Sequence, residues 1–413
     1  MNGTRLLTRL TELGAIGAGQ GNGRTRLAFS REDHAARKKL LEWMLAADLC
    51  VKTDELGSLY GFTADPGVGD APVVLAGSHI DTVRNAGHLD GCLGVIAALE
   101  AVSALKADSK PAHAIFGVAA FANEEGVVLS PDLMGSRYFC GDFSSEDFRR
   151  AAAAAGFDPS GLLHDYPDRE VMRLADLNLR AFLELHIEQG PVLETREARI
   201  GIVTGVQGCR WLSVTLEGTS NHAGTTPMSL RKDAFAGVCE VGHGLERMAL
   251  AGKPNVATVG TCAVHRGSIN VVPGSVAFTI DLRDGCERQL DAAESTARTL
   301  IANIAQRRGL TYTVERISAS SCVAFDAQMV ELLRQSCNAQ LHADEALMMI
   351  SGASHDAQIL AAHAPTAMLF IPSLGGISHN PAEASRDEDV ITGARVLWEA
   401  MRRAAYIGDS GKS

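Results

Sequence analysis

The chain has 413 residues, 46% hydrophobic and 21% charged, which suits a soluble globular protein of roughly two or three domains. Its formal net charge of −11 argues against a general nucleic-acid binder or a protein drawn to anionic membranes, because its long-range field repels both. Nine cysteines without a CxxC pair are typical of reduced thiols, and the N-terminal residues lack the apolar core of a signal peptide. We therefore expect a cytoplasmic protein.

Short apolar runs and helical patterns alternate in the first half of the chain. The runs at 72–78, 114–121 and 181–185 predict buried strands, and the periodicity of 90–106 predicts a helix. This alternation predicts an α/β domain with a mostly parallel sheet. Ligands gather at the carboxyl ends of the strands in such sheets, so polar residues at those ends are informative.

The segment 207–321 has a different pattern, because its apolar residues alternate along strands that have one exposed face. The order β-α-β-β-α-β predicts an inserted ferredoxin-like (α+β) domain. Its expected elements are strands at 210–216, 256–264, 276–282 and 311–317 and helices at 231–250 and 287–307.

The chain then returns to the first domain, which is therefore discontinuous and comprises residues 1–206 and 322–413. The later part predicts helices near 325–341, 354–363 and 387–406 and a strand at 366–371. We expect the tail at 408–413 to be disordered.

Four short stretches concentrate the polar side chains that could carry chemistry. They are GSHIDTV with GHLDG (77–91), ANEEG (122–126), HIEQGP (186–191) and SHNPAE (378–383). A hydrolytic site with two metal ions needs neutral imidazoles, a carboxylate that can bridge the ions, further carboxylates to balance charge, and a base that is not itself a ligand. The stretches supply five candidate ligands and leave Glu124 as the base. The ligands are His79, Asp90, Glu125, His186 and His379.

Asp81 lies two residues after His79. In an extended segment, its carboxylate can reach the far imidazole nitrogen of His79 and fix the tautomer, as a supporting residue does in many metal sites.

In combination these motifs resemble the M20 metallopeptidase clan, and specifically its amidase branch of hydantoinases and carbamoylases. HIEQGP, NHAGTTPM (221–228) and INVVPG (269–274) point to this branch. Its members include N-carbamoyl-L-amino-acid hydrolases, allantoate amidohydrolases and β-ureidopropionases. The resemblance implies a di-metal catalytic domain with an inserted lid and dimerisation domain, and an enzyme that hydrolyses a linear amide or ureido C–N bond.

The resemblance also implies roles for the candidate residues. His79 and His186 would hold one metal ion, Glu125 and His379 the other, and Asp90 would bridge them, with Glu124 as general base. The ions would be Zn²⁺ or Mn²⁺, although this ligand set also accepts Co²⁺ or Ni²⁺. The expected substrate contacts are His222, which is also expected to act in catalysis, Asn270 and Arg283, with a weaker expectation for Gln189 and Arg210. The counterpart of His222 reaches into the partner's active site in relatives, so a homodimer is implied.

Several alternatives stay open from the sequence. Arg283 could bind a substrate carboxylate, in its own subunit's site or its partner's, or could pair with Asp281 or Asp284. Relatives often have Arg-Phe where this chain has Val127-Val128, and glycine where it has Ser354, and either change could reshape the pocket. The alternative functions are an N-acyl amino acid deacylase or dipeptidase-like hydrolase of the same clan, and an inactive binding protein. The intact Glu124 argues against the last.

Overall fold

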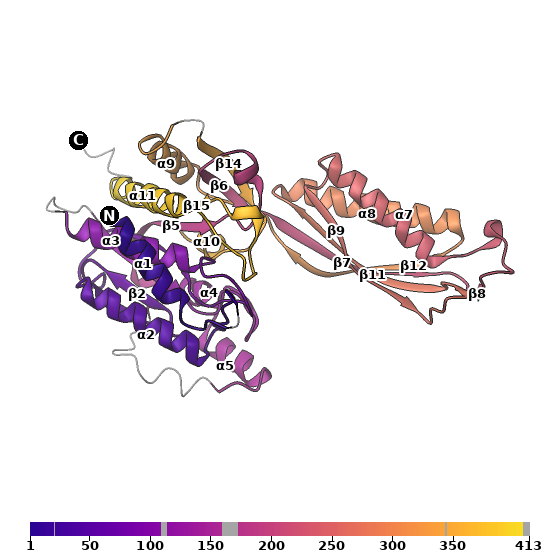
Figure 1. Ribbon diagram of the computed structural model, residues 1–413, viewed down its shortest axis with the longest axis horizontal. Coiled ribbons are helices and arrows are strands. Elements are labelled where there is room, and N and C mark those ends of the chain that lie inside the picture. Colours follow the sequence, from indigo (N-terminus) through magenta and orange to yellow (C-terminus); the bar gives the residue numbers. More distant parts are fainter. Residues whose placement is uncertain (20, 109–113, 159–171, 343–344, 408–413) are drawn as a thin grey trace. The chain divides into compact units, whose positions relative to one another are not determined.

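The computed structural model describes residues 1–19, 21–108, 114–158, 172–342 and 345–407. It divides the chain into two compact units (Figure 1). Unit 1 comprises Met1–Thr204 and Ala324–Ser413, and unit 2 comprises Gly205–Val323. The tail at 408–413, which was expected to be disordered, lies outside the described residues. No helix among the described residues combines the length and the apolar character needed to cross a bilayer.

Unit 1 is built on a nine-stranded sheet with the order β1-β2-β4-β3-β5-β15-β6-β13, in which β14 pairs with β6. The central strands β4, β3, β5 and β15 are parallel, whereas β1, β2 and β6 pair antiparallel with their neighbours. The strands are β1 (Cys50–Thr53), β2 (Leu59–Phe62), β3 (Val73–His79), β4 (Ile115–Phe121), β5 (Leu179–Ile187), β6 (Ile200–Val206), β13 (Val323–Ala324), β14 (Ala346–Ser351) and β15 (Thr366–Ile371).

Helices cover this sheet on both faces. The largest core joins the sheet to α1, α2, α3, α9 and α11. The helices α4 and α10 pack against each other, and they also contact the sheet, α4 at β4 and α10 at β5 and β15. The helices are α1 (Gly3–Gly14), α2 (Arg31–Ala46), α3 (Cys92–Lys106), α4 (Met134–Cys140), α5 (Ser145–Ala154), α6 (Val192–Thr195), α9 (Ala327–Asn338), α10 (Asp356–Leu360) and α11 (Asp387–Ala404).

The burial of the central strands explains why they appear in the sequence as continuous apolar runs. Every residue of β3, β4 and β15 is buried, as expected for parallel strands covered on both faces. The predicted α/β class with a mostly parallel central sheet is confirmed. The antiparallel strands β1, β2 and β6, the strand β14 beside β6, and the N-terminal helices α1 and α2 were not predicted.

Unit 2 contains a four-stranded antiparallel sheet with the order β12-β7-β11-β9, and α7 and α8 pack on it. Alternate residues of β7 and β11 are buried, because only one face of this sheet carries helices. A short ladder of β8 and β10 completes the unit (Figure 1). Its elements are β7 (Gly208–Glu217), β8 (Asn221–His222), α7 (Ala234–Leu250), β9 (Val256–His265), β10 (Val271–Val272), β11 (Ser275–Asp284), α8 (Glu287–Arg308) and β12 (Thr311–Ser320).

Candidate metal centre

The site lies at the carboxyl ends of three neighbouring parallel strands of unit 1. His79 is the last residue of β3 and pairs in register with Phe121, the last residue of β4. The turn after β4 carries Glu124 and Glu125, and His186 lies near the end of β5. Residues far apart in sequence therefore meet at one sheet edge, as the strand order requires.

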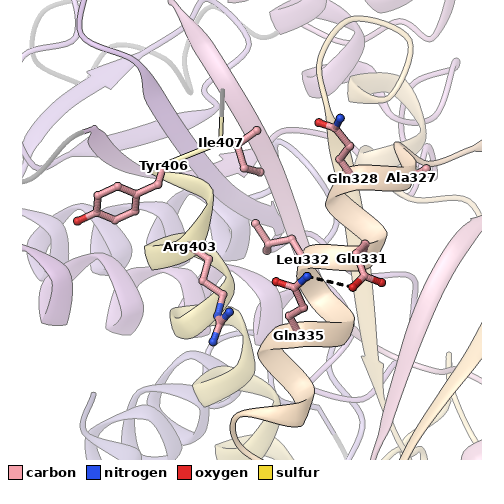
Figure 2. A pocket seen from close by; sticks show the side chains of 8 residues that line it. All are labelled: Ala327, Gln328, Glu331, Leu332, Gln335, Arg403, Tyr406 and Ile407. Atoms are coloured by element: carbon pink, nitrogen blue, oxygen red, sulfur yellow. Dashed lines mark hydrogen bonds between the residues drawn. The ribbon is translucent and has the colours of Figure 1, made fainter. Parts of the chain in front are cut away.

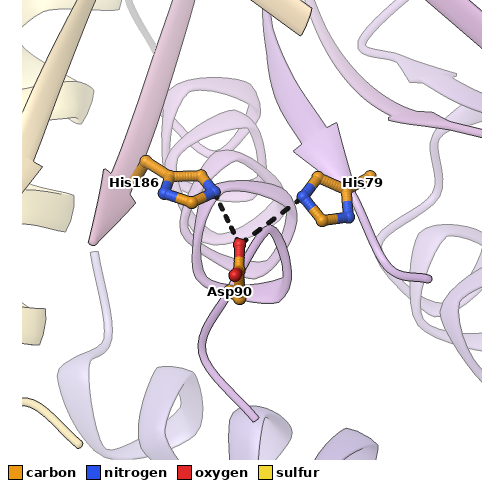
Figure 3. Close-up of side chains that lie close together, drawn as sticks. All are labelled: His79, Asp90 and His186. Atoms are coloured by element: carbon orange, nitrogen blue, oxygen red, sulfur yellow. Dashed lines mark ion pairs between the residues drawn. The ribbon is translucent and has the colours of Figure 1, made fainter. Parts of the chain in front are cut away.

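Asp90 lies on the loop before α3 and faces the two histidines (Figure 3). Its Oδ1 lies 3.0 Å from His186 Nε2 and 3.7 Å from His79 Nε2. These three side chains form a group whose donor atoms lie within 4.8 Å of one another. All three are buried, and their polar atoms converge from separate elements.

The second carboxylate oxygen of Asp90 faces a different group. Asp90 Oδ2 lies 3.1 Å from His379 Nε2, which is 3.5 Å from Glu125 Oε2. Asp90, Glu125 and His379 likewise have donor atoms within 4.8 Å of one another. Each oxygen of Asp90 thus serves one group, which is the arrangement of a bridging carboxylate.

The two groups fit divalent metal ions. Tetrahedral ligands about 2.0–2.2 Å from an ion are separated by about 3.3–3.6 Å, close to the separations found in both groups. Glu125 Oε1 is buried without a hydrogen-bond partner among the described residues, so it retains an unused lone pair. His79 and His186 direct Nδ1 to carbonyl oxygens, of Asp81 at 3.0 Å and Ile187 at 2.9 Å, which leaves the lone pair on Nε2. In His186 this Nε2 also accepts the backbone N–H of Gly91 at 3.1 Å, a bond that a metal ion would replace.

Asp81 supports the site differently from the expectation. The His79 imidazole contacts the main-chain carbonyl of Asp81, and the Asp81 carboxylate is farther from Nδ1, at 3.8 Å. That carboxylate instead accepts the backbone N–H groups of Glu124, at 3.3 Å, and Glu125, at 3.2 Å. The turn after β4 has backbone N–H groups that need acceptors, and the Asp81 carboxylate supplies them. Asp81 therefore supports the turn through its side chain and His79 through its main-chain carbonyl.

The electrostatics of the site also indicate a need for positive charge. Burial and the neighbouring Asp90 carboxylate raise the pKa of Glu125 to about 8. Burial opposes the charge of Asp90, but hydrogen bonds from His186 and His379 hold its pKa well below the usual range. A bound cation would stabilise both carboxylates as anions.

Glu124 is placed as a base should be. It is 8% exposed, and its Oε2 lies 3.5 Å from His79 Nε2 without joining either ligand group. Burial, followed by the charges of Asp356 and Glu125, raises its pKa well above the usual value. A carboxylate that binds protons this readily can accept one from water.

A cavity of about 130 Å³ opens onto the groups. Glu124, Gln189 and Ser354 line it together with the ligand candidates Asp90, Glu125, His186 and His379, and with Asp132 and Ala353. Gln189 Nε2 donates to Asp90 Oδ2 at 3.0 Å, so this predicted substrate contact lies beside the bridging position. Ser354 contributes a residue with a hydroxyl group to this lining.

A larger hollow of about 530 Å³ lies elsewhere on unit 1, between α9 and the end of α11 (Figure 2). Its polar lining includes the hydrogen-bonded pair of Gln335 and Glu331. It contains no histidine, and its carboxylate Glu331 is paired with Arg334 at 2.7 Å. Volume therefore does not identify the reactive site in this unit.

Two predicted substrate contacts of unit 2 lie next to each other. His222 in β8 pairs with Val271, and Ala223 N donates to Asn270 O at 2.9 Å. His222 Nδ1 accepts the backbone N–H groups of Gly224 and Thr225, so Nε2 carries the hydrogen and can act as a donor. Both side chains are exposed.

The two predicted arginines differ in their availability. Arg210 is 5% exposed and faces α8, where it pairs with Glu287 and with Asp291 at 2.8 Å. These partners engage its guanidinium within unit 2. Arg283 is half-buried on the helix-free face of β11 and pairs with Asp281 at 3.0 Å, one of the pairings that the sequence left open.

The sequence interpretation assigned no role to Glu383 and left His355 open between pocket lining and a structural hydrogen bond, yet both lie beside the candidate metal centre. Glu383 is 4% exposed and accepts hydrogen bonds from the loop that carries Asp90. His355 is buried, with its ring centroid 4.6 Å from that of His186 and its Nε2 2.9 Å from Ser351 Oγ. The signal for Glu383 was a carboxylate four residues after His379 across a proline, within a motif already singled out.

Comparisons with known proteins agree with this geometry. The model of peptidase family M20/M25/M40 matches residues 75–403. The chain is 38% identical to an N-carbamoyl-L-amino-acid amidohydrolase from Pseudomonas sp. (strain NS671), over 96% of this chain and 97% of that protein. It is 36% identical to an allantoate amidohydrolase from Escherichia coli (strain K12), over 95% and 96%.

Solved structures give the same result. A hydantoinase/carbamoylase family amidase from Burkholderia multivorans superposes with a TM-score of 0.90 at 35% identity, covering 98% of both chains. The family match and the ligand groups together indicate the use of divalent metal. The chain therefore belongs to peptidase family M20/M25/M40 and, within it, to the hydantoinase/carbamoylase amidases.

Proposed function

We propose that this protein is a di-metal amidohydrolase that cleaves the C–N bond of an N-carbamoyl-L-amino acid or a related ureido acid such as allantoate or β-ureidopropionate. The observation that carries the proposal is Asp90, whose two oxygens face separate ligand groups beside an uncommitted carboxylate, Glu124. The substrate class comes from the relatives named above. Ions of Zn²⁺ or Mn²⁺ suit the imidazole and carboxylate donors, and Co²⁺ or Ni²⁺ would also be accepted.

His79, His186 and Asp90 would hold one ion, and Asp90, Glu125 and His379 the other. Bound ions supply a Lewis acid that polarises the poorly electrophilic ureido carbonyl and acidifies water. Glu124 removes a proton from the attacking water and returns it to the nitrogen that leaves, so the carboxylate is regenerated. For a carbamoyl substrate, the products are ammonia, carbon dioxide and the free amino acid.

Unit 2 would supply the remaining contacts to the substrate. His222 Nε2–H and the Asn270 amide are donors for the oxygen that becomes negative in the tetrahedral intermediate, a role worth roughly 3–4 kcal/mol for each good donor. Arg283 would exchange Asp281 for the substrate carboxylate. We leave Arg210 out of the substrate site because Glu287 and Asp291 engage it.

We also propose a homodimer formed through unit 2, in which His222 serves the partner's site. β9 is an edge strand of the sheet of unit 2, and most of its residues are exposed, including Val256 and Val264. An uncovered edge of this kind is suited to pairing with a second copy. The nine cysteines, all free thiols, support a cytoplasmic location.

A substrate panel tests the proposed reaction. Metal-reconstituted enzyme should release ammonia from at least one of N-carbamoyl-L-amino acids, allantoate and β-ureidopropionate, and Glu124→Gln should reduce kcat by roughly 10²–10⁴-fold through loss of the base. Hydrolysis of N-acyl amino acids or dipeptides alone would contradict the ureido assignment. An unchanged kcat in Glu124→Gln would remove Glu124 from the mechanism.

A further inference from the structure

The loops that carry Asp90 and His379 meet at one buried carboxylate, Glu383. Glu383 Oε1 accepts the backbone N–H of Leu89 at 3.0 Å and that of Asp90 at 3.2 Å. The paired segments lie 294 residues apart along the chain. Glu383 therefore fixes the main chain on which the bridging carboxylate is mounted.

The other oxygen of Glu383 fixes the side chain of Asp90. Glu383 Oε2 accepts the hydroxyl of Ser378 at 3.0 Å, and the same hydroxyl lies 3.2 Å from Asp90 Oδ2. Ser378 directly precedes His379, which Asp90 Oδ2 faces at 3.1 Å. Ser378 Oγ therefore lies between the two carboxylates, and its single hydrogen can go to only one of them at a time. This shared hydroxyl couples the position of Glu383 to the half of Asp90 that serves the second ligand group.

The packing around Glu383 leaves little freedom. A Cβ at Gly87 would lie 2.3 Å from Glu383 Oε1, so the loop before Asp90 closes directly over the carboxylate. Among the described residues, Glu383 forms no ion pair with an arginine or a lysine, and two backbone N–H groups and a hydroxyl contact its carboxylate. Burying the Glu383 carboxylate close to that of Asp90 without a cation costs free energy. Stability of the fold therefore gives no reason for a carboxylate here, and a role in the site does.

We infer that Glu383 is a positioning residue that sets the bridging orientation of Asp90. It thereby allows a metal ion to bind at the second position, formed by Asp90, Glu125 and His379. The inference rests on the proposed di-metal function. The first position depends less on Glu383, because it uses Asp90 Oδ1 with His79 and His186.

Three variants separate positioning from simple packing. Glu383→Ala removes every contact of the carboxylate. Glu383→Gln keeps one oxygen for the two backbone N–H groups, and its amide NH2 can donate to the Ser378 oxygen. Ser378→Ala removes the hydroxyl that lies between Glu383 Oε2 and Asp90 Oδ2, together with its contact to Gln189 Nε2, and leaves the two backbone contacts of Glu383 in place. It therefore tests the inference if Glu383→Ala does not fold.

Asp284→Ala is the matched control. Asp284 is also buried, at 3% exposed, and also accepts two backbone N–H groups, from Asn255 at 3.1 Å and Cys286 at 2.8 Å, but it belongs to unit 2. Its loss should lower the thermal midpoint without changing the number of ions bound by unit 1.

The experiment is calorimetric titration of Mn²⁺ into full-length apoprotein, with metal content measured on the reconstituted samples. Wild type, Glu383→Gln and Asp284→Ala should each bind two ions. Glu383→Ala and Ser378→Ala should bind the first ion normally and the second roughly 10–100-fold more weakly, as for other residues that support metal ligands.

If Glu383→Ala and Ser378→Ala bind each of the two ions as tightly as wild type does, the inference is overturned and the proposed function is left intact. The same weakening in Asp284→Ala would overturn it as well, since the effect would then be general destabilisation. A wild-type enzyme that binds a single ion would contradict the di-metal function itself.

Discussion

At the scale of single residues, Gly91 shows how closely the backbone approaches a proposed metal ligand. Gly91 has φ of +63°, and a Cβ there would lie 2.4 Å from His79 Nε2, the nitrogen that would bind metal. Gly141 has φ of +87°, but a Cβ there would meet no atom within 4 Å. Both glycines have a positive φ, but ψ is −46° at Gly91 and 5° at Gly141. An alanine at Gly91 therefore combines backbone strain with obstruction of the ligand atom, whereas an alanine at Gly141 carries backbone strain alone.

We predict that Gly91→Ala lowers both metal content and kcat, because the methyl group displaces the imidazole. Gly141→Ala should carry only the backbone cost, about 1–2 kcal/mol, and retain metal and activity. Thermal unfolding, metal analysis and ammonia release would be measured on both variants. Full metal binding by Gly91→Ala would show that His79 does not use Nε2 as a ligand atom.

At the scale of elements, α2 supports the turn that carries Glu124 and Glu125. Arg37 of α2 is 3% exposed and donates to the carbonyl oxygens of Ala120 and Phe121 at the end of β4, both at 3.2 Å. It also pairs with Asp33 at 3.0 Å. Asp81 holds the N–H groups on the other side of the same turn, so the turn is fixed from both directions.

We predict that Arg37→Met destabilises the protein by about 3–5 kcal/mol, because it leaves the buried charge of Asp33 without its partner. The midpoint of thermal unfolding should fall clearly. Arg334→Met breaks an exposed pair with Glu331 on α9 and should leave the midpoint unchanged. Similar midpoints for the two variants would show that the buried network does not stabilise unit 1.

At the scale of the whole molecule, the proposed dimer can be tested by mixing two inactive variants. If His222 serves the partner's site, a heterodimer of Glu124→Gln and His222→Ala contains one site with both residues intact. After subunit exchange, an equimolar mixture should regain about one quarter of wild-type activity, because half of the dimers are mixed and each has one working site. Ammonia release would be measured before and after exchange.

Sedimentation equilibrium provides the control, since the proposed dimer has twice the 43.7 kDa mass of the chain. A dimeric mass with no recovered activity would place His222 in its own subunit's site. A monomeric mass would exclude the exchange altogether.

Local sequence patterns were sufficient to predict many of the strands and the candidate metal ligands. The buried runs at β3, β4 and β15 could be found because parallel strands covered on both faces are apolar throughout. The strands β7 and β11 of unit 2 could be found because their residues alternate in burial. The metal-ligand candidates were recognisable because imidazoles and carboxylates follow strand ends at which ligands gather.

Only the tertiary structure decided which atoms face one another. The sequence named Asp81 as a partner of His79, yet its carboxylate binds the backbone of the turn after β4, because that turn leaves two N–H groups to satisfy. It named Arg210 as a substrate contact, whereas α8 brings Glu287 and Asp291 against it.

Glu383 illustrates the same limit. Nothing in the local pattern links it to Leu89 and Asp90, because that contact joins distant parts of the chain. The sequence by itself determined the residue types of the site and the strands that present them, since both depend on short-range periodicity and side-chain chemistry. Long-range packing decided which oxygen and which nitrogen each group offers, because these directions are set only when separate elements come together.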